Sequence, residues 1–313
     1  MCLAAACGDD PIHHLGDAPL SQALPGIYVT TQTNTVTVFA LDASGDAAPV
    51  RTIAGPSTML SLPLGIGVDR QGLIYVANRT GSVVTAFQKD VTGDVAPMRV
   101  LTDPMMLSPA GLAVDTNDDL YVSTCPNCGT SNGGAIGLFH FPAGSPTSDF
   151  SIQGAGLTNP GIVLDSDRNL VVANSFGGSV ETFAPGSTAG ATPFRTFTPA
   201  GNQNTQSEIA AGGVIILASP ADGLDIYPAD TTGAAATPTA TIGQAMLPLQ
   251  YPGGMYLDAS VSPPVLYVND YVGNAIFVVQ TTGSGAALGV GSVRKIVGPT
   301  TTLSNPLGIT VVH

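Results

Sequence analysis

A pattern of short apolar segments returns six times along the chain and restricts its possible folds more than any other feature. The clearest copy runs from Pro63 to Asn78. An apolar segment entered through proline and glycine ends in aspartate, and after a tight turn a second apolar segment contains Ile-Tyr-Val. The second segments are centred on Tyr28, Tyr75, Tyr121, Val171, Ile216 and Tyr267. Their spacing of 45 to 51 residues indicates one structural unit per copy.

Each unit continues with two more segments that predict a third and a fourth strand. In the clearest copy these are Val83–Phe87 and Pro97–Leu101, separated by a turn region. Four short strands in roughly 40–50 residues is the period of a propeller blade, in which small sheets pack face to face around an axis. The repeat therefore predicts a ring of such blades.

The two ends of the repeat region predict how the ring closes. The first strand, Gly26–Thr30, is of the second type and lacks an inner partner, whereas the chain ends with an unpaired inner strand, Pro306–Val312. Pairing these two strands completes one blade and leaves no free sheet edge. We expect an all-β fold: a six-bladed β-propeller with four antiparallel strands per blade, closed by the C-terminal strand, as one domain over residues 25–313.

The repeat also has a family likeness. The pattern Pro-x-Gly-Ile-x-Val-Asp, then Gly-x-Leu-Tyr-Val-Ala-Asn, then Val-x-x-Phe resembles the NHL repeat and the related YVTN-type repeats of bacterial secreted propellers, over residues 26–312. This resemblance implies a six-bladed propeller of the bacterial cell envelope. It does not imply one activity, because such propellers serve as protein-binding platforms, sensor domains, lactonases and lyases.

Composition excludes several classes of partner. The chain has 22 acidic and 9 basic side chains, a net charge of -13, which disfavours binding to nucleic acid because phosphates require a cationic surface. Charged residues make up only 10%, while Gly 38 and Pro 25 favour turns and short strands over helices. No apolar run is long enough for a membrane-spanning helix.

The N-terminal residues predict a location. A small apolar run, Leu3–Ala6, ends at Cys7 and is followed by an acidic spacer that contains proline. This resembles the end of a bacterial lipoprotein signal, in which the cysteine is lipidated and becomes the mature N-terminus. The resemblance implies an extracytoplasmic protein of the bacterial envelope, in the periplasm or on the outer surface, that meets the membrane only through its lipid. Residues 1–24 would be this signal-like segment and a tether; an ordinary N-terminal tether is the alternative.

Two rows of polar residues recur from blade to blade. The loops that enter inner strands and those that join second to third strands should share one face, called the top face below. One row lies at this face: Thr31, Asn78, Thr124, Asn174, Ser219 and Asp270. Because its polar type recurs in every blade, we interpret it as hydrogen bonding to local backbone, with ligand binding by Asn78, Asn174 and Asp270 as the alternative. The second row, at the opposite face, has the same structural interpretation: Asp69, Asp115, Asp165 and Asp258.

One position of the inner strands differs between blades. It reads Gly67, Ala113, Val163, Glu208, Tyr256 and Thr310 around the ring. A carboxylate near the axis must be solvated, paired or bound to a cation, which makes Glu208 and its neighbour Tyr256 candidate catalytic residues. A slip of register in this degenerate blade would instead place Glu208 in a surface loop.

A metal-dependent alternative follows from the same residue. Calcium-dependent lactonases with six blades use an inner glutamate with asparagine and aspartate ligands, and Glu208, Asn78, Asn174 and Asp270 supply those residue types. Glu208 is then the candidate calcium ligand. The four histidines, at positions 13, 14, 140 and 313, assemble neither a zinc ring nor a Ser-His-Asp triad.

Cys125 and Cys128 form a CxxC motif in an enlarged top loop of the third blade. Such a motif can be a redox pair, half of a zinc site or a small disulfide. No second CxxC or nearby histidine completes a zinc site, and no βαβ pattern frames a thioredoxin-like site. In an oxidising compartment we expect a disulfide that fixes the loop.

These observations favour a monomeric, non-enzymatic binding or scaffold module without a cofactor. Its partner at the top face would be an envelope protein, a polysaccharide or a small ligand. The alternative is a lactonase-like hydrolase with calcium as its cofactor at an axial site.

Overall fold

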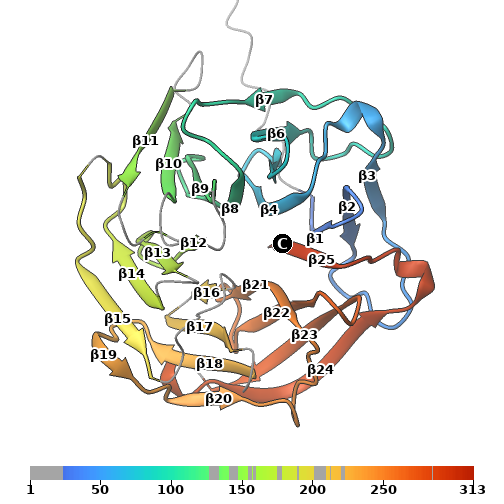
Figure 1. Ribbon diagram of the computed structural model, residues 1–313. Coiled ribbons are helices and arrows are strands. Elements are labelled where there is room, and N and C mark those ends of the chain that lie inside the picture. The colour runs from blue at the N-terminus through green and yellow to red at the C-terminus, as the bar shows by residue number, and fades with distance from the viewer. Residues whose placement is uncertain are drawn as a thin grey trace, which may run out of the picture.

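The computed structural model shows a ring of six small sheets (Figure 1), which confirms the predicted six-bladed β-propeller. It describes residues 24–126, 134–140, 147–153, 157, 160–174, 178–188, 190–200, 209–211, 213–219, 223–283 and 285–313. Within these ranges, helix is limited to three short 3-10 turns: η1 (Pro56–Thr58), η2 (Gly285–Ala287) and η3 (Pro299–Thr301). No helix in the described part of the chain is long and apolar enough to cross a membrane.

Each blade contains an inner, a second, a third and a fourth strand, counted outward from the axis. In that order, blades 1 to 3 consist of β25 (Pro306–Val312), β1 (Gly26–Thr31), β2 (Thr35–Phe39) and β3 (Arg51–Ala54); β4 (Pro63–Val68), β5 (Ile74–Asn78), β6 (Val83–Phe87) and β7 (Arg99–Leu101); and β8 (Pro109–Val114), β9 (Leu120–Thr124), β10 (Ala135–His140) and β11 (Thr147–Gln153). Blades 4 to 6 consist of β12 (Pro160–Leu164), β13 (Leu170–Asn174), β14 (Ser179–Phe183) and β15 (Arg195–Pro199); β16 (Ile209–Ala211), β17 (Val214–Ser219), β18 (Gly223–Pro228) and β20 (Ala240–Ile242); and β21 (Pro252–Asp258), β22 (Val265–Asp270), β23 (Ala275–Thr282) and β24 (Gly289–Val297).

The C-terminal strand closes the ring as predicted. β25 lies at the axis next to β1 (Figure 1). The two strands pair antiparallel, with Ile27 opposite Val311 and Tyr28 opposite Thr310. The two strands come from opposite ends of the propeller sequence, and the blade they form joins the first strand to the last.

The hydrophobic core consists of layers between neighbouring blades. Between blades 1 and 2, buried Tyr28 and Val36 pack with Ile66, Ile74 and Val76. The tyrosine of the Leu-Tyr-Val segments fills this layer, and its equivalents Tyr75, Tyr121 and Tyr267 are at most 3% exposed. Burying such large side chains is the main favourable contribution to the packing of one blade on the next.

The glycine of the Pro-x-Gly signal is required by the approach of the inner strands. A Cβ atom at Gly308 would lie 2.2 Å from the Leu64 carbonyl oxygen of the next inner strand, and one at Gly65 would lie 2.5 Å from the Ala110 carbonyl oxygen. The backbones at the axis are therefore too close for any side chain at these positions.

In blades 1, 2 and 5 the loop between the third and fourth strands covers the outer edge of the neighbouring blade. The loop of blade 1 forms a parallel bridge from Gly45 to Ile296 of blade 6, and that of blade 2 forms one from Gly93 to Ile53 of blade 1. In blade 5 the same loop forms β19 (Gly233–Ala236), which pairs parallel with β15 of blade 4. These loops protect outer strands that would otherwise present unpaired backbone groups.

Candidate functional site

The polar row at the top face holds loops in place. Asn78 is fully buried: its Oδ1 accepts a hydrogen bond from the Ser61 amide at 2.9 Å, and its Nδ2 donates to Thr85 Oγ1 at 2.9 Å. The buried Asp270 carboxylate accepts hydrogen bonds from the Tyr251 and Gly273 amides, both at 3.1 Å. These contacts support the structural interpretation of the row.

Asn174 of the same row donates a hydrogen bond to an acidic residue, Glu181, that the sequence analysis missed. Its Nδ2 lies 3.2 Å from Glu181 Oε1, which also accepts a hydrogen bond from Ser179 Oγ. Burial raises the pKa of Glu181 above its ordinary value. The equivalent residue in blade 2 is Thr85, so comparing third strands across blades would have exposed this carboxylate.

The described register of blade 5 puts an alanine at the axial position that the sequence analysis gave to Glu208. In blade 5, Ala210 pairs with Ile216, which places Ala210 in the row of Gly67 and Tyr256. Glu208 lies outside the described residues, as do residues 201–207, and its role stays a hypothesis. Burial raises the pKa of Tyr256 to about 12, which favours the protonated phenol at neutral pH.

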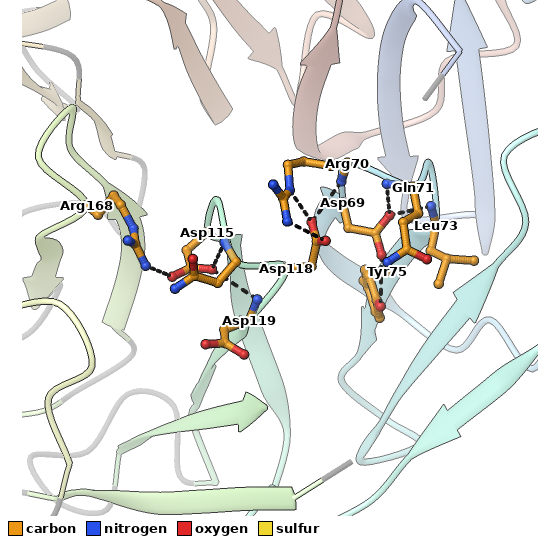
Figure 2. Close-up of polar contacts among 10 residues, drawn as sticks. Asp69, Arg70, Gln71, Leu73, Tyr75, Asp115, Asp118, Asp119 and Arg168 are labelled. Carbon is orange, nitrogen blue, oxygen red and sulfur yellow. Dashed lines mark hydrogen bonds and ion pairs between the residues drawn. The ribbon is translucent and has the colours of Figure 1, made fainter. Parts of the chain in front are cut away.

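The aspartate row at the opposite face closes the turns between inner and second strands, as predicted. Asp69 Oδ1 accepts hydrogen bonds from the Gln71 and Leu73 amides at 2.9 and 2.8 Å, and its Oδ2 accepts one from the Tyr75 hydroxyl (Figure 2). Asp115 repeats the amide contacts in blade 3. Burial raises the pKa of Asp69, and the nearby Asp118 carboxylate adds to the effect.

Two arginines connect these turns from blade to blade (Figure 2). Arg70 of blade 2 donates through Nε and Nη2 to both oxygens of Asp118 in blade 3, at 3.2 and 3.1 Å. Arg168 of blade 4 donates to Asp115 Oδ2 at 2.5 Å, and the Asp115 side chain is only 3% exposed. Three consecutive blades are thus tied together by ion pairs that the sequence pattern did not predict.

Each of the two described histidines lies next to an aspartate carboxylate. His140 Nδ1 is 3.0 Å from Asp119 Oδ2, and His313 Nε2 is 2.7 Å from Asp258 Oδ2, linking the end of β25 to blade 6. Among the described residues, no group of three or more histidine, cysteine, aspartate and glutamate side chains is placed to hold a metal ion.

The cysteine predictions lie partly outside the described residues. Cys125 follows β9, is 3% exposed, and donates its amide to the Ser108 carbonyl at 3.1 Å. Cys128 and Cys7 are not among the described residues. The disulfide between Cys125 and Cys128 and the lipidation of Cys7 stay predictions.

One part of the top face combines aromatic and amide side chains. The Tyr251 and Tyr271 rings meet edge to face, with centroids 6.0 Å apart and planes at 64°. The Tyr271 hydroxyl donates to Gln32 Oε1 of blade 1 at 2.9 Å, and Asn305 Nδ2 donates to the Tyr271 carbonyl at 3.0 Å. Val272 beside them is 50% exposed. These residues, together with Gln250, are called the tyrosine patch below.

The comparisons with known proteins identify the fold. No family model matches the chain, and no curated protein matches it. Among solved structures, a streptogramin B lyase is 14% identical with a TM-score of 0.54, over 92% of this chain and 87% of the lyase. A chain of a nidogen/laminin complex is 15% identical with a TM-score of 0.59, over 91% and 98% of the two chains.

A further similar structure contains a cofactor. The PQQ-bound aldose sugar dehydrogenase of Streptomyces coelicolor is 14% identical with a TM-score of 0.50, over 77% of this chain and 82% of the enzyme. At such identities the likeness concerns the backbone alone, and the three proteins differ in function. What this chain shares with these distant neighbours is the β-propeller fold.

Proposed function

We propose that the chain is an exported, lipid-anchored binding module that takes a component of the bacterial envelope at its top face. The observation that carries this proposal is the exposure of apolar side chains on loops that are held rigidly. Met246 is 51% exposed, Tyr251 44% and Val272 50%, all on the loops around the entry to blade 6. Exposed apolar side chains gathered on one face are typical of binding surfaces.

The rigidity comes from the buried polar row beneath these loops. Asp270 holds the backbone amides of Gln250, Tyr251 and Gly273. A Cβ atom at Gly273 would lie 2.2 Å from Asp270 Oδ2, so the turn fits closely around the carboxylate. A surface that is already ordered loses less conformational entropy when it binds. The polar row is engaged in this support, which favours a binding role over a catalytic one.

The test is retention of envelope material on the immobilised protein. Val272→Glu places a charge within the exposed patch and should abolish retention without unfolding the domain. The matched control is Val50→Glu, because Val50 is 59% exposed on the outer circumference just before β3. Equal retention by wild type and both variants would refute a binding role for this face.

A further inference from the structure

We propose that the tyrosine patch binds a neutral carbohydrate, with Tyr251 and Tyr271 as the stacking platform; this inference rests on the proposed function. A sugar ring has an apolar face of C–H groups and a rim of hydroxyl groups. A ligand with this chemistry requires aromatic faces and uncharged hydrogen-bonding groups side by side. The tyrosine patch supplies both.

The aromatic part is formed by two residues from adjacent segments of blade 6. Tyr251 precedes β21 and is 44% exposed, while Tyr271 follows β22 and donates its backbone amide to the Tyr251 carbonyl at 2.8 Å. Their edge-to-face arrangement, with the ring planes at 64°, places a ring face next to a ring edge. Tyrosine adds a hydroxyl group at the tip of an apolar body, which suits a ligand that is apolar on one side and polar at its rim.

The polar part comes from primary amides on three loops. Gln32 and Gln250 are exposed, and Asn305 lies beside the Tyr271 backbone. Each amide carries donors and acceptors, as sugar hydroxyls do, so either partner can donate. The contact from the Tyr271 hydroxyl to Gln32 crosses from blade 6 to blade 1, which makes the patch a product of ring closure.

The scarcity of charged residues on the loops around the tyrosine patch favours a neutral ligand over a charged one. The top loops of blades 6, 1 and 2, at 32–34, 55–62, 79–82, 243–251, 271–274 and 298–305, contain no acidic residue and one basic residue, Arg79. An anionic polymer finds a single basic side chain, Arg79, on these loops and is repelled by a net charge of -13. The tyrosine patch itself contains no carboxylate for a cationic ligand; the carboxylates next to these loops are Asp46, which accepts a hydrogen bond from the Thr300 amide, and Asp94, which accepts one from the Ser57 amide. The chemistry that remains is an uncharged polyol.

The test is affinity electrophoresis of the full chain through gels containing soluble glucomannan, arabinoxylan, mixed-linkage β-glucan or dextran, with polygalacturonate as the anionic comparison. At least one neutral polysaccharide should retard the wild type, and Tyr251→Ala should weaken that retardation about tenfold or more. Tyr251→Phe should retain most of it, because the ring is kept. Phe194→Ala is the matched control, since Phe194 is 55% exposed on the outer edge.

Two results would overturn the inference: no retardation by any neutral polysaccharide, or retardation unchanged by Tyr251→Ala. Treating the envelope material with protease or with periodate before it is applied to the immobilised protein distinguishes failure of this inference from failure of the proposed function. Retention that is lost after protease treatment but survives periodate oxidation indicates a protein partner, which refutes the carbohydrate and leaves the binding role intact. Retention that is unchanged by Val272→Glu, or no retention at all, refutes the proposed binding role of this face.

Discussion

Replacing Gly308 by alanine tests the packing of the inner strands where the ring closes. Gly308 lies on β25, and the added Cβ would lie 2.2 Å from the Leu64 carbonyl oxygen and 3.2 Å from the Ile66 amide of β4. The first distance is too short for any contact between these atoms. Both neighbours are backbone atoms, so the two strands must move apart by about 1 Å, and overpacking of this kind costs about 1–3 kcal/mol.

The same movement breaks a polar bridge. Thr30 Oγ1 accepts a hydrogen bond from the Gly308 amide at 2.8 Å and donates to the Leu64 carbonyl at 2.6 Å. Thr30 is fully buried, and each lost hydrogen bond costs about 0.5–1.5 kcal/mol. Against these losses, alanine stabilises the protein by about 0.4–1 kcal/mol, because it lowers the conformational entropy of the unfolded chain. The free energy of unfolding should therefore fall by about 1–5 kcal/mol.

The measurement is equilibrium unfolding in guanidinium chloride, with the slope of the transition compared between variants. Gly81→Ala is the control, because a Cβ there meets its nearest atom, Val83 Cγ2, at an ordinary 3.5 Å. The control should be neutral or slightly more stable than the wild type. If Gly308→Ala unfolds within about 0.5 kcal/mol of the wild type at an unchanged slope, the close approach of the inner strands is not a constraint on the fold.

Three further predictions concern closure and charge. Deleting residues 306–313 removes β25, and scanning calorimetry should then show loss of the single cooperative transition; an unchanged transition contradicts the closure. In the wild type, burial raises the pKa of Glu181, so the native state binds that proton more tightly than the unfolded state and stability falls as pH rises through the raised pKa. Glu181→Gln removes this pH-dependent loss of stability. The melting temperature should therefore increase at pH 7 and not at pH 4, and an equal change at both pH values contradicts the reasoning. Arg168→Gln leaves the buried Asp115 without its ion pair and should cost about 1–3 kcal/mol, whereas Arg70→Gln, at a 65% exposed side chain, should cost less than about 1 kcal/mol; the reverse order in chemical denaturation contradicts the assignment.

The repeat predicted the blades because strand positions are dictated locally. Alternating apolar residues, the Pro-x-Gly entry and the aspartate turns recur in each unit, so Ile74–Asn78 and Pro306–Val312 could be assigned from the chain alone. Blade 5 was the exception. The described part of its inner strand is Ile209–Ala211, and its register places Ala210 where Glu208 was expected.

The contacts between blades could not be predicted in the same way. Arg70 meets Asp118 across 48 residues of sequence, and Tyr271 meets Gln32 across 239. No spacing rule relates these pairs, because they depend on the angle between neighbouring sheets. The tyrosine patch was missed for this reason: each tyrosine looks like an ordinary loop residue until the ring brings the loops of blades 6 and 1 together.

The two faces of the ring use charge differently, and this has a measurable consequence. At the face of the aspartate row, Arg70 and Arg168 bind carboxylates of the neighbouring blade, whereas the tyrosine patch contains no charged residue. Salt screens exposed ion pairs but does not screen stacking or hydrogen bonds between neutral groups. Raising sodium chloride from about 0.05 to about 1 M should therefore leave polysaccharide retardation unchanged within about twofold. A steep loss of retardation with salt would show instead that an ionic contact dominates binding, and it would move the search for the ligand to the charged surfaces of the molecule.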